Sequence, residues 1–202
     1  MPITDVLSRV SELEALAAST RGEALVATPD SGDAFARALA KAAAPATTVP
    51  ASTDASGTVA AKIISAAESQ VGQAEQPPGS NDGPQIAVYR SAVAGAQPGE
   101  PWCAYFTSWA AAQAGAPLGD AGAGIGSVAE ITSWAQRTGR YVPAGSQPQP
   151  GDLILFGTEH VGLVESVNAD GSLTTIEGNS SDAVSRVHRM PGEATGFVRL
   201  GG

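Results

Sequence analysis

Residues 151–179 read GDLILFGTEHVGLVESVNADGSLTTIEGN, a series of short apolar runs separated by turn-forming residues. The runs span residues 153–156, 160–164 and 173–176 and are rich in Val, Ile, Leu and Thr. Runs of this length and composition, bounded by Gly, Asn, Asp and Ser, are typical of strands in an antiparallel sheet. The segment 168–172, NADGS, suits a hairpin turn between the second and third runs. We therefore predict an antiparallel sheet in the second half of the chain.

Three polar residues mark the ends of these strands. His160 opens the second run, while Glu177 and Asn179 follow the third run and lie two residues apart. Residues two apart in a strand point to the same side of a sheet. A hairpin between the two strands would bring His160 close to Glu177 and Asn179, as a base and the groups that orient it. In the alternative interpretation, His160 is an exposed strand residue and the other two only form a turn.

The single cysteine of the chain, Cys103, stands in the sequence PWCAYF at residues 101–106, where a loop becomes an apolar helix. Backbone N–H groups and the positive end of a helix dipole favour a thiolate, the form that attacks a carbonyl carbon. Alternatively, Cys103 fills the core as a small apolar side chain. The rival base, His188, has Arg186 and Arg189 as neighbours and suits an exposed position in a later strand.

Helical patterns precede the strands. We predict four helices, over about residues 59–71, 84–93, 103–115 and 128–138. Pro84 favours the first position of the second helix. Ser127 and Glu130 form a capping-box pattern at the start of the fourth helix. Helices followed by strands indicate the α+β class.

Four motifs, PWCAYFTSWAAAQAG, PQPGDLILFG, HVGLVESV and TIEGNSS, occur in this order between residues 101 and 181. In this combination the chain resembles the CHAP family, the cysteine- and histidine-dependent amidohydrolases/peptidases, over residues 58–202. The resemblance implies a papain-like α+β fold and hydrolysis of an amide bond in peptidoglycan. The bond either joins the glycan to its stem peptide, as cut by an N-acetylmuramoyl-L-alanine amidase, or lies within the stem or cross-bridge, as cut by an endopeptidase.

The resemblance also implies roles for individual residues. Cys103 would be the nucleophile and His160 the general base. Glu177 and Asn179 would be the polar pair that holds the imidazole. We expect the backbone N–H of Cys103 and one further donor to stabilise the oxyanion.

Three further residues are candidates for substrate binding. Asn81 and Gln85 lie in a polar segment upstream of Cys103 and are candidates for the second oxyanion donor. Trp102 either packs in the core or borders the substrate groove.

The sequence predicts neither a metal nor a cofactor. Many relatives have a longer, Asp-rich loop before the histidine, and nearby acidic residues hold calcium in some of them. Here the connection is only Gly157-Thr158-Glu159, without the oxygen-rich pattern of calcium loops. The two histidines, His160 and His188, stand far apart and form no zinc-binding motif, which disfavours a metal-dependent wall hydrolase.

Composition limits the partners of this chain of 202 residues. The net charge is −9 and the pI is about 4.6, so we expect no binding to nucleic acid, whose phosphates would repel the protein. No run approaches the roughly 20 apolar residues of a membrane span. Residues 1–5 have none of the features of a Sec signal peptide. We expect a monomer that acts at the cell wall or outside the cell and is exported by another route.

The first part of the chain differs from the rest. Apolar side chains at helical spacing predict amphipathic helices over residues 4–19 and 33–43, within an N-terminal segment of residues 1–44. Residues 45–57 are rich in Ala, Thr, Pro and Ser and predict a linker to the catalytic domain at residues 58–202. The N-terminal segment resembles leader regions of wall hydrolases encoded with flagellar components, which implies docking on a flagellar or other wall-spanning assembly. Alternatively, its helices pack on the catalytic domain.

A second class of function remains compatible with these patterns. The chain would then be a wall-binding or assembly protein, possessing a hydrolase fold with weak or no activity. The full set of Cys103, His160, Glu177 and Asn179 argues against that class.

Overall fold

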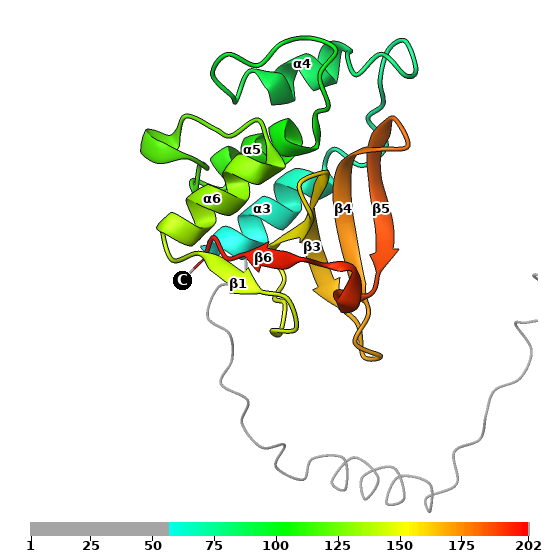
Figure 1. Cartoon of the computed structure of the whole chain (residues 1–202). Helices are drawn as coiled ribbons and strands as arrows, with labels where there is room; N and C mark the ends of the chain where they lie inside the picture. The colour runs from blue at the N-terminus through cyan, green and yellow to red at the C-terminus, as the bar shows by residue number, and fades with distance from the viewer. Residues whose placement is uncertain (1–56, 202) are drawn as a thin grey trace, which may run out of the picture. The chain divides into compact units, whose positions relative to one another are not determined.

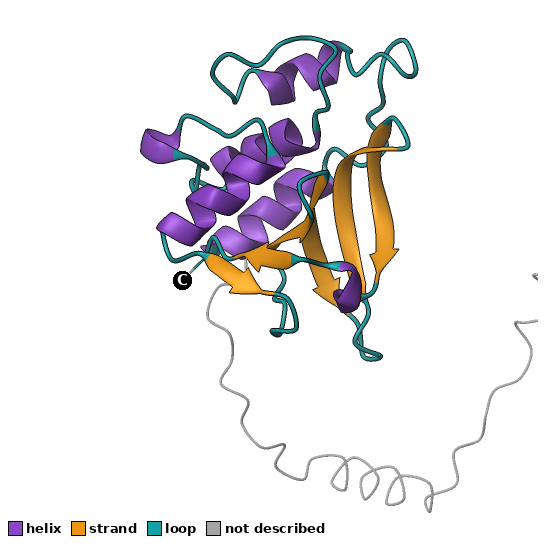
Figure 2. Ribbon diagram, viewed as in Figure 1, coloured by secondary structure: helices purple, strands orange, loops and turns teal. Residues whose placement is uncertain are grey.

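The computed structural model of the chain describes residues 57–201. The predicted segment 1–44 and nearly all of the linker at 45–57 lie outside these residues. The described part has four α-helices on one side of a six-stranded antiparallel sheet (Figures 1 and 2). The helices are α3 (Val59–Glu68), α4 (Pro84–Arg90), α5 (Cys103–Gln113) and α6 (Val128–Arg137). This arrangement confirms the predicted α+β class and is consistent with a papain-like fold.

The sheet is built mainly from consecutive hairpins. Its strands are β1 (Tyr141–Pro143), β2 (Leu153–Phe156), β3 (His160–Val167), β4 (Leu173–Ser180), β5 (Ala183–Arg189) and β6 (Gly196–Val198). Their order is β1-β6-β2-β3-β4-β5, so the last strand inserts between β1 and β2. Two short 3-10 helices, η2 (Asp120–Gly122) and η3 (Pro191–Glu193), complete the described elements. The sequence did not predict β1 and β6, because three residues are too few for a periodic pattern.

The starts of α4 and α6 follow the predicted local signals, and α3 has a cap that was not predicted. Thr58 caps α3 by accepting a hydrogen bond from the N–H of Ala61, and Pro84 is the first residue of α4. The side chain of Ser127 accepts a hydrogen bond from the N–H of Glu130 at the start of α6. However, α3 ends at Glu68 and α4 at Arg90, each three residues earlier than predicted. After α3 the chain turns, and the N–H of Gly72 donates a hydrogen bond to the carbonyl of Val184 in β5.

Helix α5 lies at the centre of the main core, between the other helices and the sheet. Eight of its residues are buried. The helix side of the sheet contributes alternate residues of its strands, such as Leu163 and Ile176. Gly178 of β4 allows the closest approach, because a Cβ at this position would lie 2.6 Å from the Cβ of Phe106. Thus β4 packs directly against the helix that begins at Cys103.

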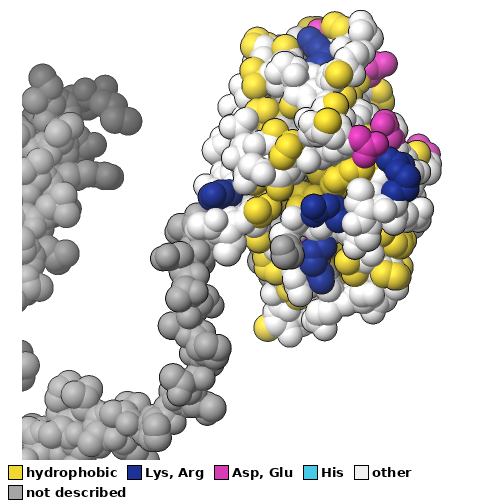
Figure 3. All heavy atoms as spheres, turned by 90° about the vertical axis from the view of Figure 1, so that its left-hand side faces the viewer, with side chains coloured by type: hydrophobic (Ala, Val, Ile, Leu, Met, Phe, Trp, Pro, Cys, Tyr) yellow, Lys and Arg dark blue, Asp and Glu magenta, His cyan; other side chains and the backbone are white. Residues whose placement is uncertain are grey.

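The surface offers no single dominant charge on the face that lies at the left of Figure 1. Charged side chains of both signs appear there, with hydrophobic side chains between them (Figure 3). Within residues 57–201, every helix falls short of the length and apolar character required to cross a membrane.

Candidate active site

Cys103 is the first residue of α5 and follows Trp102, the N-cap residue. Its side chain is free of disulfide bonds and buried, with 4% of the residue exposed. The positive end of the helix dipole lies at this position. Cys103 also lines a pocket of about 700 Å³, a space that can hold a ligand.

Trp102 fixes the start of this helix from inside the core. Its ring is fully buried and stacks on Tyr89, with the ring centroids 5.8 Å apart. The indole Nε1 donates a hydrogen bond of 2.9 Å to the buried carboxylate of Glu75, which also accepts one from the N–H of Asn81. The ring has no exposed surface, which favours the interpretation of Trp102 as a core residue, and its assignment to substrate binding stays a prediction.

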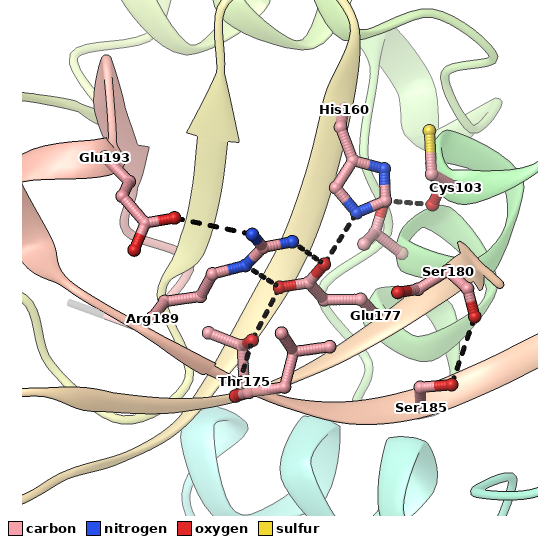
Figure 4. Close-up of polar contacts among 10 residues, drawn as sticks. Cys103, His160, Thr175, Glu177, Ser180, Ser185, Arg189 and Glu193 are labelled. Carbon is pink, nitrogen blue, oxygen red and sulfur yellow. Dashed lines mark hydrogen bonds and ion pairs between the residues drawn. The ribbon is translucent and has the colours of Figure 1, made fainter.

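His160 is the first residue of β3 and pairs with Phe156 across a tight hairpin. The two rings lie against each other, with centroids 5.8 Å apart and an angle of 30° between their planes. Figure 4 shows the imidazole between Cys103 and Glu177. Its Nε2 lies 2.8 Å from Oε2 of Glu177, so the other ring nitrogen is the one on the side of Cys103.

The protonation of His160 depends on both neighbours. Burial by itself lowers the pKa of His160, but hydrogen bonds with Cys103 and Glu177 and their negative charges raise it to about 9. A histidine with this pKa is an imidazolium at neutral pH. The geometry therefore fits an imidazolium placed between a thiolate and a carboxylate.

Glu177 is completely buried and has two hydrogen-bond donors at each carboxylate oxygen. Oε1 accepts from Thr175 Oγ1 at 2.6 Å and from Arg189 Nε at 2.8 Å. Oε2 accepts from Arg189 Nη2 at 2.7 Å and contacts His160 Nε2. These contacts leave the buried carboxylate without an unsatisfied oxygen (Figure 4).

The same contacts determine the charge of Glu177. Burial raises the pKa of Glu177, but the hydrogen bonds from Arg189, His160 and Thr175 outweigh it and lower that pKa to about 2. Glu177 is therefore a carboxylate over the whole physiological pH range. It can stabilise a positive charge on His160 and hold the ring in one orientation.

A glycine makes room for this carboxylate. Gly162 lies two residues after His160 on β3, and a Cβ at this position would come within 2.7 Å of Cγ of Glu177. Any larger residue would push the Glu177 side chain away from its present place. Gly162, the glycine of the HVG sequence, is thus required for the present position of the Glu177 side chain.

The other predicted polar residue, Asn179, lies in an irregular part of β4. The pairing of β4 with β5 shifts between Glu177 and Ser180, and Asn179 has a left-handed φ of 57°. Its side chain makes no hydrogen bond with His160 among the described contacts. The role of Asn179 therefore stays a prediction from the resemblance, whereas the contact of Glu177 with the imidazole is a feature of the geometry.

The two upstream candidates lie apart from the pocket that Cys103 lines. Gln85 of α4 donates its side-chain amide to Gln70, at 2.8 Å. Asn81 has a left-handed φ of 51°, and its N–H is bound to Glu75. Neither side chain contacts Cys103 in this structure, so their assignment to substrate binding also stays a prediction. His188 is exposed on β5, as expected for a residue that does not pair with the thiol.

Sequence reasoning missed two residues of the site, Thr175 and Arg189. Thr175 lies two residues before Glu177 on the same side of β4, so strand alternation could have identified it. Arg189 was interpreted only as a neighbour of His188. Its contact with Glu177 depends on the β4–β5 pairing, which no local pattern in the sequence specifies.

The pocket beside Cys103 is acidic. Glu100, Glu130 and Glu159 are among its lining residues, and no Lys or Arg lines it in the described part of the chain. Hydrogen bonds from the Tyr105 hydroxyl and the N–H of residue 97 lower the pKa of Glu100, which keeps it ionised. Across residues 57–201, no three His, Cys, Asp or Glu side chains gather in a way that could hold a metal ion.

Comparison with known proteins supports the resemblance drawn from the motifs. The model of the CHAP domain family matches residues 95–179, a segment that includes Cys103, His160 and Glu177. No curated protein and no solved structure matches the chain. This segment is similar to the CHAP domain, a type of domain that is generally a cysteine- and histidine-dependent amidohydrolase or peptidase and is associated with peptidoglycan. Arg189 lies outside the matched segment.

Proposed function

We propose that this protein is a thiol hydrolase that cuts an amide bond in bacterial peptidoglycan. The observation that carries the proposal is the continuous arrangement of Cys103, His160 and Glu177, with His160 in contact with both other side chains. The bond is that cut by an N-acetylmuramoyl-L-alanine amidase or a bond within the stem or cross-bridge, cut by an endopeptidase.

The proposed reaction begins with the thiolate of Cys103. Its sulfur attacks the carbonyl carbon of the amide, and the backbone N–H of Cys103 at the helix start favours the resulting oxyanion. The imidazolium of His160 gives its proton from the nitrogen facing Cys103 to the departing nitrogen. The carbon–nitrogen bond breaks, the amine leaves, and a thioester on Cys103 remains.

Water completes the cycle. Neutral His160 takes a proton from water, the hydroxide attacks the thioester, and the carboxylic acid product leaves as the thiolate returns. Glu177 accepts the hydrogen bond of Nε2 throughout, so that the ring keeps the same orientation in both steps. No step requires a metal ion or a cofactor.

The charge of the pocket supports a peptide substrate. Glu100, Glu130 and Glu159 border the space beside Cys103 without a basic neighbour in the lining. Such a pocket attracts amino groups and repels anionic wall polymers. A stem peptide with a free amino group near the scissile amide fits this distribution of charge.

The decisive experiment is digestion of purified sacculi by the full-length chain, followed by mass spectrometry of the products. New amino and carboxyl termini identify the bond, and the variant Cys103→Ala provides the inactive control. We expect iodoacetamide to abolish the reaction and EDTA to leave it unchanged. The reverse sensitivity would indicate a metal-dependent hydrolase and contradict the proposed mechanism.

The alternative is a wall-binding or assembly protein that has the hydrolase fold with weak or no turnover. It is distinguished by sedimentation with sacculi under conditions in which no new termini form. If the chain sediments with sacculi but cuts neither sacculi nor stem-peptide fragments, this alternative is correct and the hydrolase proposal fails.

We also propose that the protein works at the cell wall, as a monomer, and that residues 1–44 recruit it to a flagellar or other wall-spanning assembly. The support is the amphipathic pattern in this segment together with the wall substrate. Deleting residues 1–44 should leave activity on isolated sacculi unchanged and abolish localised cutting in cells. If the deletion destroys activity on sacculi, the segment belongs to the catalytic domain instead.

A further inference from the structure

Three side chains hold the guanidinium of Arg189 in the site. It binds both oxygens of Glu177 through Nε and Nη2, and its Nη1 lies 3.4 Å from the carboxylate of Glu193 in η3. Its Cζ lies over the ring of Phe156, 4.6 Å from the ring centroid. Phe156 in turn stacks against His160. Planar, bidentate contacts of this kind fix a carboxylate in angle as well as in distance.

We propose that Arg189 is a positioning residue of the active site, which keeps Glu177 ionised and aimed at Nε2 of His160. This inference rests on the proposed thiol-hydrolase function. Arg189 itself does not touch Cys103 or the pocket beside it. It acts through Glu177, which in turn acts on the imidazole.

The need for Arg189 follows from the burial of Glu177. A carboxylate with no exposed surface favours its neutral form unless positive charge and hydrogen bonds compensate. Thr175 supplies only one neutral hydroxyl, and His160 carries a charge only while it is protonated. During the reaction His160 gives up its proton, so Arg189 is then the one cation in contact with Glu177 among the described residues.

Within residues 57–201, charged and polar groups surround this carboxylate from several elements. His160 faces it from β3 and Arg189 from β5, while Thr175 is its partner on β4. Cys103 of α5 lies beyond His160 and Glu193 of η3 beyond Arg189. Removing the arginine leaves the burial unchanged, so the pKa of Glu177 should rise. At low pH a larger share of the protein would then have a neutral Glu177.

The test compares Arg189→Gln with Arg186→Gln in the full-length chain. Arg186 lies on the same strand and also binds both oxygens of a glutamate, Glu165, through Nε and Nη2 at 2.8–2.9 Å, but outside the site. We expect Arg189→Gln to lower kcat by about 10- to 100-fold with little change in KM. The loss should be larger at pH 5 than at pH 8, because the acid limb of the rate profile shifts to higher pH when the pKa of Glu177 rises. Arg186→Gln should keep the wild-type profile, and Arg189→Lys should recover part of kcat.

Two further measurements separate positioning from support of the fold. In a Glu177→Gln background, Arg189→Gln should cause no further loss of kcat, because Arg189 acts through Glu177. Nuclear magnetic resonance of the His160 ring should show a changed titration in Arg189→Gln and an unchanged one in Arg186→Gln. An equal loss at every pH, or independent losses in the double variant, would overturn the proposal. The resonance measurement needs no turnover, so it tests Arg189 even if the protein cuts no wall substrate.

Discussion

Two arginines of β5, Arg189 and Arg186, each bind both carboxylate oxygens of a glutamate, but at different depths: Glu177 of β4 and Glu165 of β3. The side chain of Glu177 has no exposed surface and that of Arg189 has 26%. In the other pair the exposed fractions are 15% for Glu165 and 48% for Arg186. The arginines stand three residues apart, so they point to opposite sides of the strand. One pair thus enters the site, and the other lies at the surface.

The difference decides what each pair can contribute. Solvent screens the exposed pair, and such a pair contributes about 0–1 kcal/mol to stability. In the buried pair, the loss of either partner leaves a charge with few ways to be solvated. Glu177 also contacts His160. Glu165, by contrast, interacts with Arg186 and Glu68, which lie at the surface. Of the two pairs, only the buried one therefore connects a residue of β5 to the imidazole of the candidate active site.

The largest expected effect comes from replacing Cys103 or His160, the two residues that form the candidate active site together with the buried Glu177–Arg189 pair. Cys103→Ser and His160→Ala should each lower the rate of wall hydrolysis by three or more powers of ten, roughly the cost of losing a member of a catalytic triad. Circular dichroism should remain that of the wild type. Release of soluble fragments from sacculi measures the rate. Retention of more than about a tenth of the activity by Cys103→Ser would contradict the thiol mechanism.

The next effect in size comes from breaking the two pairs in the same way. Glu177→Gln should lower kcat by about 10²- to 10³-fold, because the imidazolium loses its oriented counterion. It should also lower the free energy of unfolding by about 2 kcal/mol, since Arg189 loses its partner in a mostly buried place. Glu165→Gln, the matched control, should change stability by less than about 1 kcal/mol.

Urea denaturation and steady-state kinetics on the same preparations check both quantities. Similar losses in the two variants would show that burial does not distinguish the pairs. A rate for Glu177→Gln close to that of the wild type would remove Glu177 from the mechanism.

A smaller effect is expected from moving the buried pair without changing a charge. Gly162→Ala places a Cβ within 2.7 Å of Cγ of Glu177, which must then shift relative to His160. We expect kcat to fall by about tenfold and stability by about 1–3 kcal/mol, as for other overpacked sites. Gly192→Ala is the control, because a Cβ there would have no atom within 4 Å. Equal kinetics for both variants would show that the position of Glu177 tolerates the shift.

The smallest effect concerns pH. The pKa of His160 is raised from 6.5 to about 9, so the imidazolium needed to protonate the leaving amine should fall to half near pH 9. The stability that this interaction provides is present in full below pH 6.5 and is lost as the pH rises through 9. In Cys103→Ala the titration should move to lower pH, because burial remains while one of the raising contacts is lost.

Resonances of the His160 ring, assigned with the help of His188→Gln, follow this titration directly. Activity that stays constant beyond pH 10 would contradict the requirement for an imidazolium. A titration of His160 that Cys103→Ala leaves unchanged would contradict the interaction between Cys103 and the imidazole.

Short-range patterns determined much of this fold and part of the site. The loop-to-helix change at PWCAYF placed Cys103 at the start of α5, and the apolar runs bounded by turn residues placed His160 at the start of β3. The two-residue period of a strand put Glu177 at the end of a run where a hairpin could bring it to His160. These features depend on periods and caps that a few consecutive residues express.

Other features depended on the tertiary structure alone. Some of these features join residues that are distant in sequence, namely the insertion of β6 between β1 and β2, the burial of Trp102 and the contact of Arg189 with Glu177. Another, the irregular pairing around Asn179, alters a regular strand. The sequence of β5 alone does not show which of its arginines faces a buried carboxylate. The pairing with β4 sets the register of β5 and therefore the face of the sheet to which each arginine points. The sequence by itself thus identified the thiol, the imidazole and the carboxylate, whereas strand pairing decided which cation holds that carboxylate in place.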